Sequence, residues 1–73
     1  MQVIQINLHH SRAATAALRN HLEEGGSQIA LIQEPHVVKG VVCGLGGNFN
    51  HFYVRGIEKP RACIVADKSL NIR

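Results

Sequence analysis

The chain has few of the residues that cross-link small proteins. It contains 73 residues, with two cysteines, two prolines and no tryptophan. Cys43 and Cys63 fit neither a C-x-x-C pair nor a zinc-ligand spacing, which disfavours a disulfide-dense scaffold and an independent zinc or redox protein. No apolar run is long enough to cross a bilayer, and no signal-peptide pattern is present. We therefore expect an intracellular protein, nuclear or cytoplasmic, that is not secreted and has no membrane partner.

Aromatic residues and acidic residues are also scarce. The three aromatics, Phe49, Phe52 and Tyr53, lie close together, whereas a sheet that stacks single-stranded nucleic acid needs them dispersed. Eight Lys and Arg residues against five Asp and Glu residues give a formal charge of +3. This balance is compatible with a nucleic-acid partner, but the basic residues are spread thinly and do not require one.

The first half of the chain shows two clear hydrophobic periods. Residues 2–8 alternate apolar and polar side chains, which predicts a strand with one strongly apolar face. From Ser11, a suitable N-cap, the apolar period becomes helical and predicts a helix over residues 12–23, ended by the glycine pair 25–26. Residues 29–33 form a short apolar run, and pairing should stop at Pro35 because proline cannot donate to a strand ladder.

The second half is less regular. The segment 35–50 is rich in glycine and has no defensible period, so it is interpreted as a long surface loop, a type of segment that often lines a binding site. Residues 51–54 are expected to form a short strand. A hairpin should follow, with an apolar strand over 62–66, a turn at 67–69 and a return strand from 70 to 73.

This order of elements predicts an α/β fold. Strand, helix, strand, loop and hairpin form a partial α/β sandwich, in which a mixed sheet packs against the helix. The first two strands should be parallel and joined by a right-handed crossover. Because the last predicted strand leaves a sheet edge unpaired, we expect residues 1–73 to be the amino-terminal fragment of one larger domain, with no second domain.

Two apparent ligand motifs do not fit their patterns. The glycine-rich run 40–47 lacks the Gly-Lys-Ser/Thr of a phosphate loop, and position 49 is Phe49, where a dinucleotide fingerprint needs glycine. The five histidines show no spacing typical of zinc ligands. A flexible loop and surface or packing histidines are the favoured interpretations.

Asn7 and Glu34 stand out because each lies at or near the end of a predicted strand. Adjacent parallel strands bring their carboxyl ends to the same edge of the sheet, where ligands commonly bind. An amide and a carboxylate together offer oxygen ligands that suit Mg²⁺ or Mn²⁺. The other interpretation is that both residues merely cap loops, and spacing alone leaves this open.

The residues around these positions resemble a known family. Gln-Ile-Asn-Leu at 5–8, the Ala/Leu-rich helix and Ile-Ala-Leu-Ile-Gln-Glu-Pro at 29–35 are similar to the start of an endonuclease/exonuclease/phosphatase domain. The similarity is closest to the apurinic-type endonuclease domains of non-LTR retrotransposons, particularly insect elements. The segment 61–68, Arg-Ala-Cys-Ile-Val-Ala-Asp-Lys, resembles the family's next core strand. The resemblance spans the whole chain but only the amino-terminal part of the domain.

The resemblance implies a DNA endonuclease that uses Mg²⁺ or Mn²⁺. Asn7 and Glu34 would be its catalytic and metal-holding residues, and DNA would be the partner of the complete domain. Four further residues are interpreted as nucleic-acid contacts: His9, Arg12, Lys39 and Arg61. His9 is a departure, since some relatives carry an acidic or amide residue at its position.

The family's catalytic tyrosine, Asp-x-Asn pair and Ser-Asp-His segment have no counterpart in this sequence. Without these groups the general acid-base part of catalysis lacks a candidate, so the chain is expected to be inactive alone. The alternative hypothesis is a small basic, non-catalytic binding module or a decayed element product.

Overall fold

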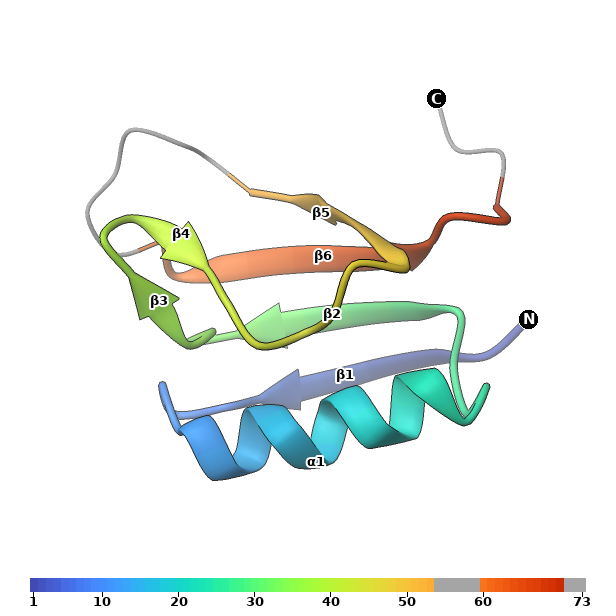
Figure 1. Cartoon of the computed structure of the whole chain (residues 1–73), viewed down its shortest axis with the longest axis horizontal. Coiled ribbons are helices and arrows are strands. Elements are labelled where there is room, and N and C mark those ends of the chain that lie inside the picture. The colour runs from blue at the N-terminus through green and yellow to red at the C-terminus, as the bar shows by residue number, and fades with distance from the viewer. Residues whose placement is uncertain (54–59, 71–73) are drawn as a thin grey trace.

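The computed structural model describes residues 1–53 and 60–70, and its elements follow one another as a strand, a helix and five further strands (Figure 1). Their bounds are β1 Val3–Asn7, α1 Arg12–Glu23, β2 Ile29–Gln33, β3 Val37–Val38, β4 Val41–Val42, β5 Phe49–Phe52 and β6 Ala62–Asp67. No helix in the described part of the chain is long and apolar enough to span a membrane.

The β1–α1–β2 unit agrees with the hydrophobic pattern of the sequence. Ser11 caps α1 by accepting a hydrogen bond from the Ala14 backbone N–H to its Oγ at 3.1 Å. At the other end Gly25 takes a positive φ of 78°, the conformation that ends many helices and that glycine adopts without steric cost. β1 and β2 then pair in parallel, with Asn7 opposite Gln33.

The four long strands form one mixed sheet in the order β1-β2-β6-β5. β6 pairs antiparallel with both β2 and β5, so it occupies a central position although it comes last in the sequence. Carboxyl ends of β1 and β2 and the beginning of β6 therefore lie at the same end of the sheet, at the left of Figure 1. The predicted α/β fold with a mixed sheet and a packed helix is confirmed.

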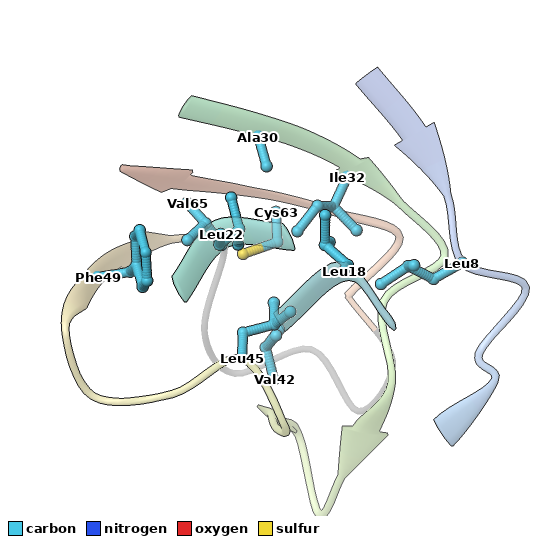
Figure 2. Close-up of a cluster of buried hydrophobic side chains, with 10 residues drawn as sticks. All are labelled: Leu8, Leu18, Leu22, Ala30, Ile32, Val42, Leu45, Phe49, Cys63 and Val65. Carbon is cyan, nitrogen blue, oxygen red and sulfur yellow. The ribbon is translucent and has the colours of Figure 1, made fainter. Parts of the chain in front are cut away.

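The core lies between one face of the sheet and α1 (Figure 2). Leu18 and Leu22 of the helix meet alternate residues of the strands, because residues two apart on a strand share a face. The buried apolar cluster consists of Leu8, Leu18, Leu22, Ala30, Ile32, Val42, Leu45, Phe49, Cys63 and Val65.

The prediction of a surface loop over residues 35–50 is wrong. β3 and β4 form a two-stranded hairpin, and β5 begins at Phe49. Val42, Leu45 and Phe49 reach the core, where Leu45 is 1% exposed. The segment has no hydrophobic period because Val42 at the end of β4, Leu45 in the following bend and Phe49 at the start of β5 contact the core as isolated residues.

The bounds of the later strands also differ from the prediction. β5 covers Phe49–Phe52 rather than 51–54, and residue 54 lies outside the described residues. β6 extends to Asp67, whose carboxylate accepts a hydrogen bond from the Ser69 N–H at 2.8 Å and so begins the turn. Leu70 is not part of a strand, and the rest of the predicted return strand, 71–73, lies outside the described residues.

The opposite face of the sheet carries exposed apolar side chains. One register row joins Gln5, Leu31, Ile64 and Phe52 across all four strands. Leu31 is 38% exposed, Ile64 46% and Phe52 45%. We call this row, together with Val3, the open face. A sheet that is apolar on both faces is the pattern of a sheet that is covered on both sides.

Candidate functional site

The candidate site lies where β1 and β2 end side by side. Two segments meet there, residues 8–11 between β1 and α1, and residues 34–36 after β2. The Leu8 N–H donates to the Gln33 carbonyl at 2.9 Å, which continues the parallel ladder one residue beyond the strands. The ends of the two strands are thus held together before the chain turns away.

His10 connects the two segments through its backbone and its side chain. Its N–H donates to the Glu34 carbonyl at 2.9 Å, and its Nδ1 lies 2.9 Å from the Pro35 carbonyl oxygen. On the other side of β2, the Glu34 N–H donates to the Arg61 carbonyl at 2.9 Å. Both backbone polar groups of Glu34 are therefore satisfied by neighbouring segments, which fixes the position of its Cα.

The backbone at this edge takes an unusual conformation. Glu34 has a φ of 50°, and the consecutive residues His9 and His10 have φ values of 50° and 57°. Positive φ is uncommon for residues other than glycine, and such residues occur preferentially at functional sites. Here the sharp turn directs the chain away immediately after each strand and leaves the side chains of Asn7 and Glu34 at the sheet edge.

The polar side chains at the edge are linked through His9. Asn7 Oδ1 accepts a hydrogen bond from the His9 N–H at 2.8 Å, and His9 Nδ1 lies 4.0 Å from Glu34 Oε2. The His9 side chain is 78% exposed and that of Glu34 40% exposed. An ion pair at that distance and exposure contributes little to stability, so the Glu34 carboxylate remains accessible to a ligand from solvent.

The other three predicted nucleic-acid contacts, Arg61, Arg12 and Lys39, do not all lie at this edge. Arg61 lies beside Glu34, through the backbone bond described above, and its side chain is exposed. Arg12 is the first residue of α1 and lines a cavity on the helix side. Lys39 is exposed at the β3–β4 turn, where its φ is 51°, and no hydrogen bond or ion pair connects it with Asn7 or Glu34 within residues 1–53 and 60–70. The structure therefore brings together Asn7, His9, Glu34 and Arg61, and leaves Lys39 apart.

His10 is a positioning residue that sequence reasoning missed. Its spacing resembled no metal or catalytic motif, and its contact with Pro35 spans 25 residues. Only the parallel arrangement of β1 and β2 brings the two segments together.

The donor set fits a hard cation incompletely. Glu34 offers one carboxylate and Asn7 one amide oxygen, and Mg²⁺ commonly binds one or two carboxylates and completes its shell with water and substrate phosphate. Among the described residues no group of three or more His, Cys, Asp and Glu side chains converges on one point. The pair therefore suits a cation that is shared with a substrate and does not form a closed protein cage.

Comparison with known proteins gives one informative match. No family model matches the chain, and no curated protein matches it. Among solved structures, the chain is similar to the "Endonuclease domain of TRAS1, a telomere-specific non-LTR retrotransposon", with a TM-score of 0.69 and 32% sequence identity. The similarity covers 94% of this chain and 29% of that chain. The predicted resemblance to a non-LTR retrotransposon endonuclease is confirmed.

The similarity to the TRAS1 endonuclease domain extends over almost the whole chain. At 94% coverage, the matched part of the chain contains most of the β1–α1–β2 unit and of the sheet. The chain spans less than a third of the length of that endonuclease structure. The match therefore supports an endonuclease-like fold over this length and does not by itself assign chemistry to the end of the sheet.

Proposed function

We propose that this chain is the amino-terminal part of a divalent-metal-dependent endonuclease domain that hydrolyses phosphodiester bonds of DNA. The observation that carries the proposal is the edge of the sheet, where the His10 N–H donates to the Glu34 carbonyl and the Glu34 N–H donates to the Arg61 carbonyl. Together with the bond from the Leu8 N–H to the Gln33 carbonyl, these bonds fix Glu34 beside the strand that ends in Asn7. This edge occurs in a chain that shares 32% identity with a retrotransposon endonuclease domain.

In this proposal Glu34 and Asn7 hold Mg²⁺ or Mn²⁺. When bound, such a cation polarises a phosphoryl oxygen and stabilises the charge that develops on the leaving oxygen. Glu34 supplies the negative charge, and Asn7 supplies an amide oxygen whose direction is set by the hydrogen bond from the His9 N–H. His9 and Arg61, at the same edge, are proposed to contact DNA phosphates, as are Arg12 and Lys39 farther along this side.

The open face supports the proposal that the chain is part of a larger domain. Val3, Leu31, Ile64 and Phe52 are all more than a third exposed, and a continuous apolar row of this kind is typical of a sheet surface that packs against another layer. The chain also spans 29% of the endonuclease structure that it resembles. We therefore expect no nuclease activity from these residues alone, since residues 1–53 and 60–70 include no group placed to activate water or protonate the leaving oxygen.

Manganese binding tests the metal site directly. Mn²⁺ broadens NMR signals of nearby nuclei, so titration of the ¹⁵N-labelled chain should first broaden the amides of Asn7, His9 and Glu34. Glu34→Gln should remove this effect, because it replaces the carboxylate at the edge with a neutral amide of the same shape. Glu24→Gln is the matched control, since Glu24 is an exposed carboxylate at the opposite end of α1.

Two outcomes would overturn the proposal. One is broadening that is equal in Glu34→Gln and in the unmodified chain. The other is an absence of broadening at the edge together with DNA binding that does not depend on metal, which would favour the small basic binding module instead.

A further inference from the structure

A second candidate site lies on the helix side of the sheet, away from Asn7 and Glu34. It is a cavity of about 310 Å³ between α1 and the chain around the β3–β4 hairpin. This volume is at the lower end of the range for small-molecule sites, roughly 300 to 1,000 Å³. We call it the helix pocket, and its lining residues are Arg12, Thr15, Ala16, Arg19, His36, Cys43 and Gly44.

The charges in the helix pocket are all positive. Arg12 and Arg19 are seven residues apart, two turns of the helix, and so lie on the same face. Among the described residues that line the pocket, none is a carboxylate. Arg19 Nε donates to Glu23 Oε1 at 2.9 Å, but this bond uses one of the five N–H donors of a guanidinium.

The amino end of α1 adds to this positive potential. The first turn of the helix contains no acidic residue, so no side chain offsets the partial positive charge that a helix carries at its N-terminus. Arg12, at the first helical position, adds its full charge there. Within residues 1–53 and 60–70 the Arg12 side chain forms no ion pair or hydrogen bond.

The neutral polar groups of the pocket direct their hydrogens elsewhere. Thr15 Oγ1 donates to the Ser11 carbonyl at 2.6 Å, and Cys43 Sγ donates to the Val41 carbonyl at 3.2 Å. Donors for a ligand therefore come from the two guanidinium groups and from the imidazole of His36. Cationic N–H donors select an anion, and the planar guanidinium fork matches the oxygens of a phosphate. Arg12 has no acidic partner among the described residues, whereas Arg19 keeps its ion pair with Glu23 and offers its remaining N–H groups.

The wall opposite the helix is held in place by the backbone. The Cys43 N–H donates to the His36 carbonyl at 3.0 Å and closes the base of the hairpin. Gly44 has a φ of 90°, and a Cβ built there would lie 2.9 Å from Thr15 Cγ2, so the loop rests directly on the helix. A pocket that exists before its ligand arrives spends less free energy on ordering when the ligand binds.

We propose that the helix pocket binds a phosphate group through Arg12, Arg19 and His36. The site is separate from the metal edge and does not depend on a metal. Arg12 follows His10 by two residues, and His36 follows Pro35, which His10 contacts. One end of the pocket lining therefore lies near the segments that hold Glu34, although the pocket itself is on the helix side of the sheet. A backbone phosphate of DNA bound at that end and a free phosphate ion share the chemistry that it recognises.

Titration in metal-free buffer tests the pocket separately from the metal edge. Inorganic phosphate and a short DNA duplex are added in parallel to the ¹⁵N-labelled chain, and the Nε–H signals of Arg12 and Arg19 are followed together with the Gly44 amide. We expect saturable shifts of these signals with both probes, and tighter binding of the duplex if the ligand is a DNA phosphate. Tighter binding of the free ion identifies a soluble phosphate as the ligand.

Three variants distinguish specific binding in the pocket from a general effect of positive charge. Arg12→Gln should weaken binding about tenfold or more, the effect of losing a charged hydrogen bond, and Arg12→Lys should weaken it less because the charge remains. Lys68→Gln, which removes one exposed positive charge at the far end of β6, should leave binding unchanged.

The inference is overturned if neither probe shifts the pocket signals, or if Arg12→Gln and Lys68→Gln weaken binding equally, which would show a general charge effect. Glu34→Gln distinguishes the two proposals. It should abolish manganese broadening and leave phosphate binding intact. Failure of the phosphate test would remove Arg12 from the proposed DNA contacts and leave the metal edge unaffected.

Discussion

Replacing Leu45 with alanine should destabilise the fold as a core mutation does, although Leu45 lies in a segment without a regular pattern. Its side chain is 1% exposed and packs in the cluster that includes Leu18 and Val42. Burying a leucine contributes about 1.5 to 3 kcal/mol, and the cavity left by alanine adds a further cost. For Leu45→Ala we therefore expect a loss of about 3 kcal/mol in the free energy of unfolding.

Leu31→Ala is the matched comparison, because it deletes the same atoms from the open face. Leu31 is 38% exposed, so its loss should cost about 1 kcal/mol. Urea unfolding followed by far-UV circular dichroism measures both, with the midpoint expected to shift while the slope of the transition stays the same. If Leu45→Ala leaves too little folded protein, Leu45→Val should still cost about 1 kcal/mol, the value of one buried methylene. Equal costs for Leu45→Ala and Leu31→Ala would show that residues 43–48 do not pack on the core.

Three further predictions concern single residues. Gly44→Ala should destabilise the chain by at least about 1 kcal/mol, since alanine is strained at positive φ and its methyl would meet the helix, and the urea midpoint measures this. Burial raises the pKa of the Cys63 thiol to about 11, against a weaker lowering by a backbone hydrogen bond from Phe52, so iodoacetamide at neutral pH should label Cys43 first, as mass spectrometry would show. Hydrogen bonds from Ser69 lower the pKa of the Asp67 carboxyl. Its contribution to stability should therefore be present above its unfolded pKa of about 3.9 and decline as the pH falls through the lower folded value. Asp67→Asn should remove that part of the acid unfolding transition.

The first half of the fold could be predicted because its signals are local. Ser11 caps the helix with its own hydroxyl, Gly25 takes the conformation that ends it, and the helical period of Leu18 and Leu22 matches the face that they bury. The helix bounds of 12 and 23 follow from these features alone. The parallel pairing of β1 with β2 then follows from the helical crossover between them, since parallel strands need a long connection.

The second half could not be predicted in the same way because its structure depends on distant partners. Val42 and Leu45 are buried against α1 and the sheet, while their neighbours Val41 and Gly44 are exposed, so no repeating pattern marks them. Thr15 is a second residue whose burial its own type does not indicate. It reads as a polar helix residue, yet it is 2% exposed, because its hydroxyl bonds to Ser11 and its methyl faces the loop at Gly44.

The candidate site combines a predictable part with an unpredictable one. Strand order places Asn7 and Glu34 at one edge, and any parallel pair would do so. The positive φ values of His9, His10 and Glu34 are not implied by strand order, and each costs roughly 1 to 3 kcal/mol unless the surroundings compensate. The hydrogen bonds that His10 forms with the carbonyls of Glu34 and Pro35 offset part of this cost. Positive φ alone does not mark a site, since Lys39 at the β3–β4 turn has a φ of 51° as well. What distinguishes His9, His10 and Glu34 is that they lie together, and their backbone bonds hold an exposed carboxylate and an amide oxygen at the end of the sheet.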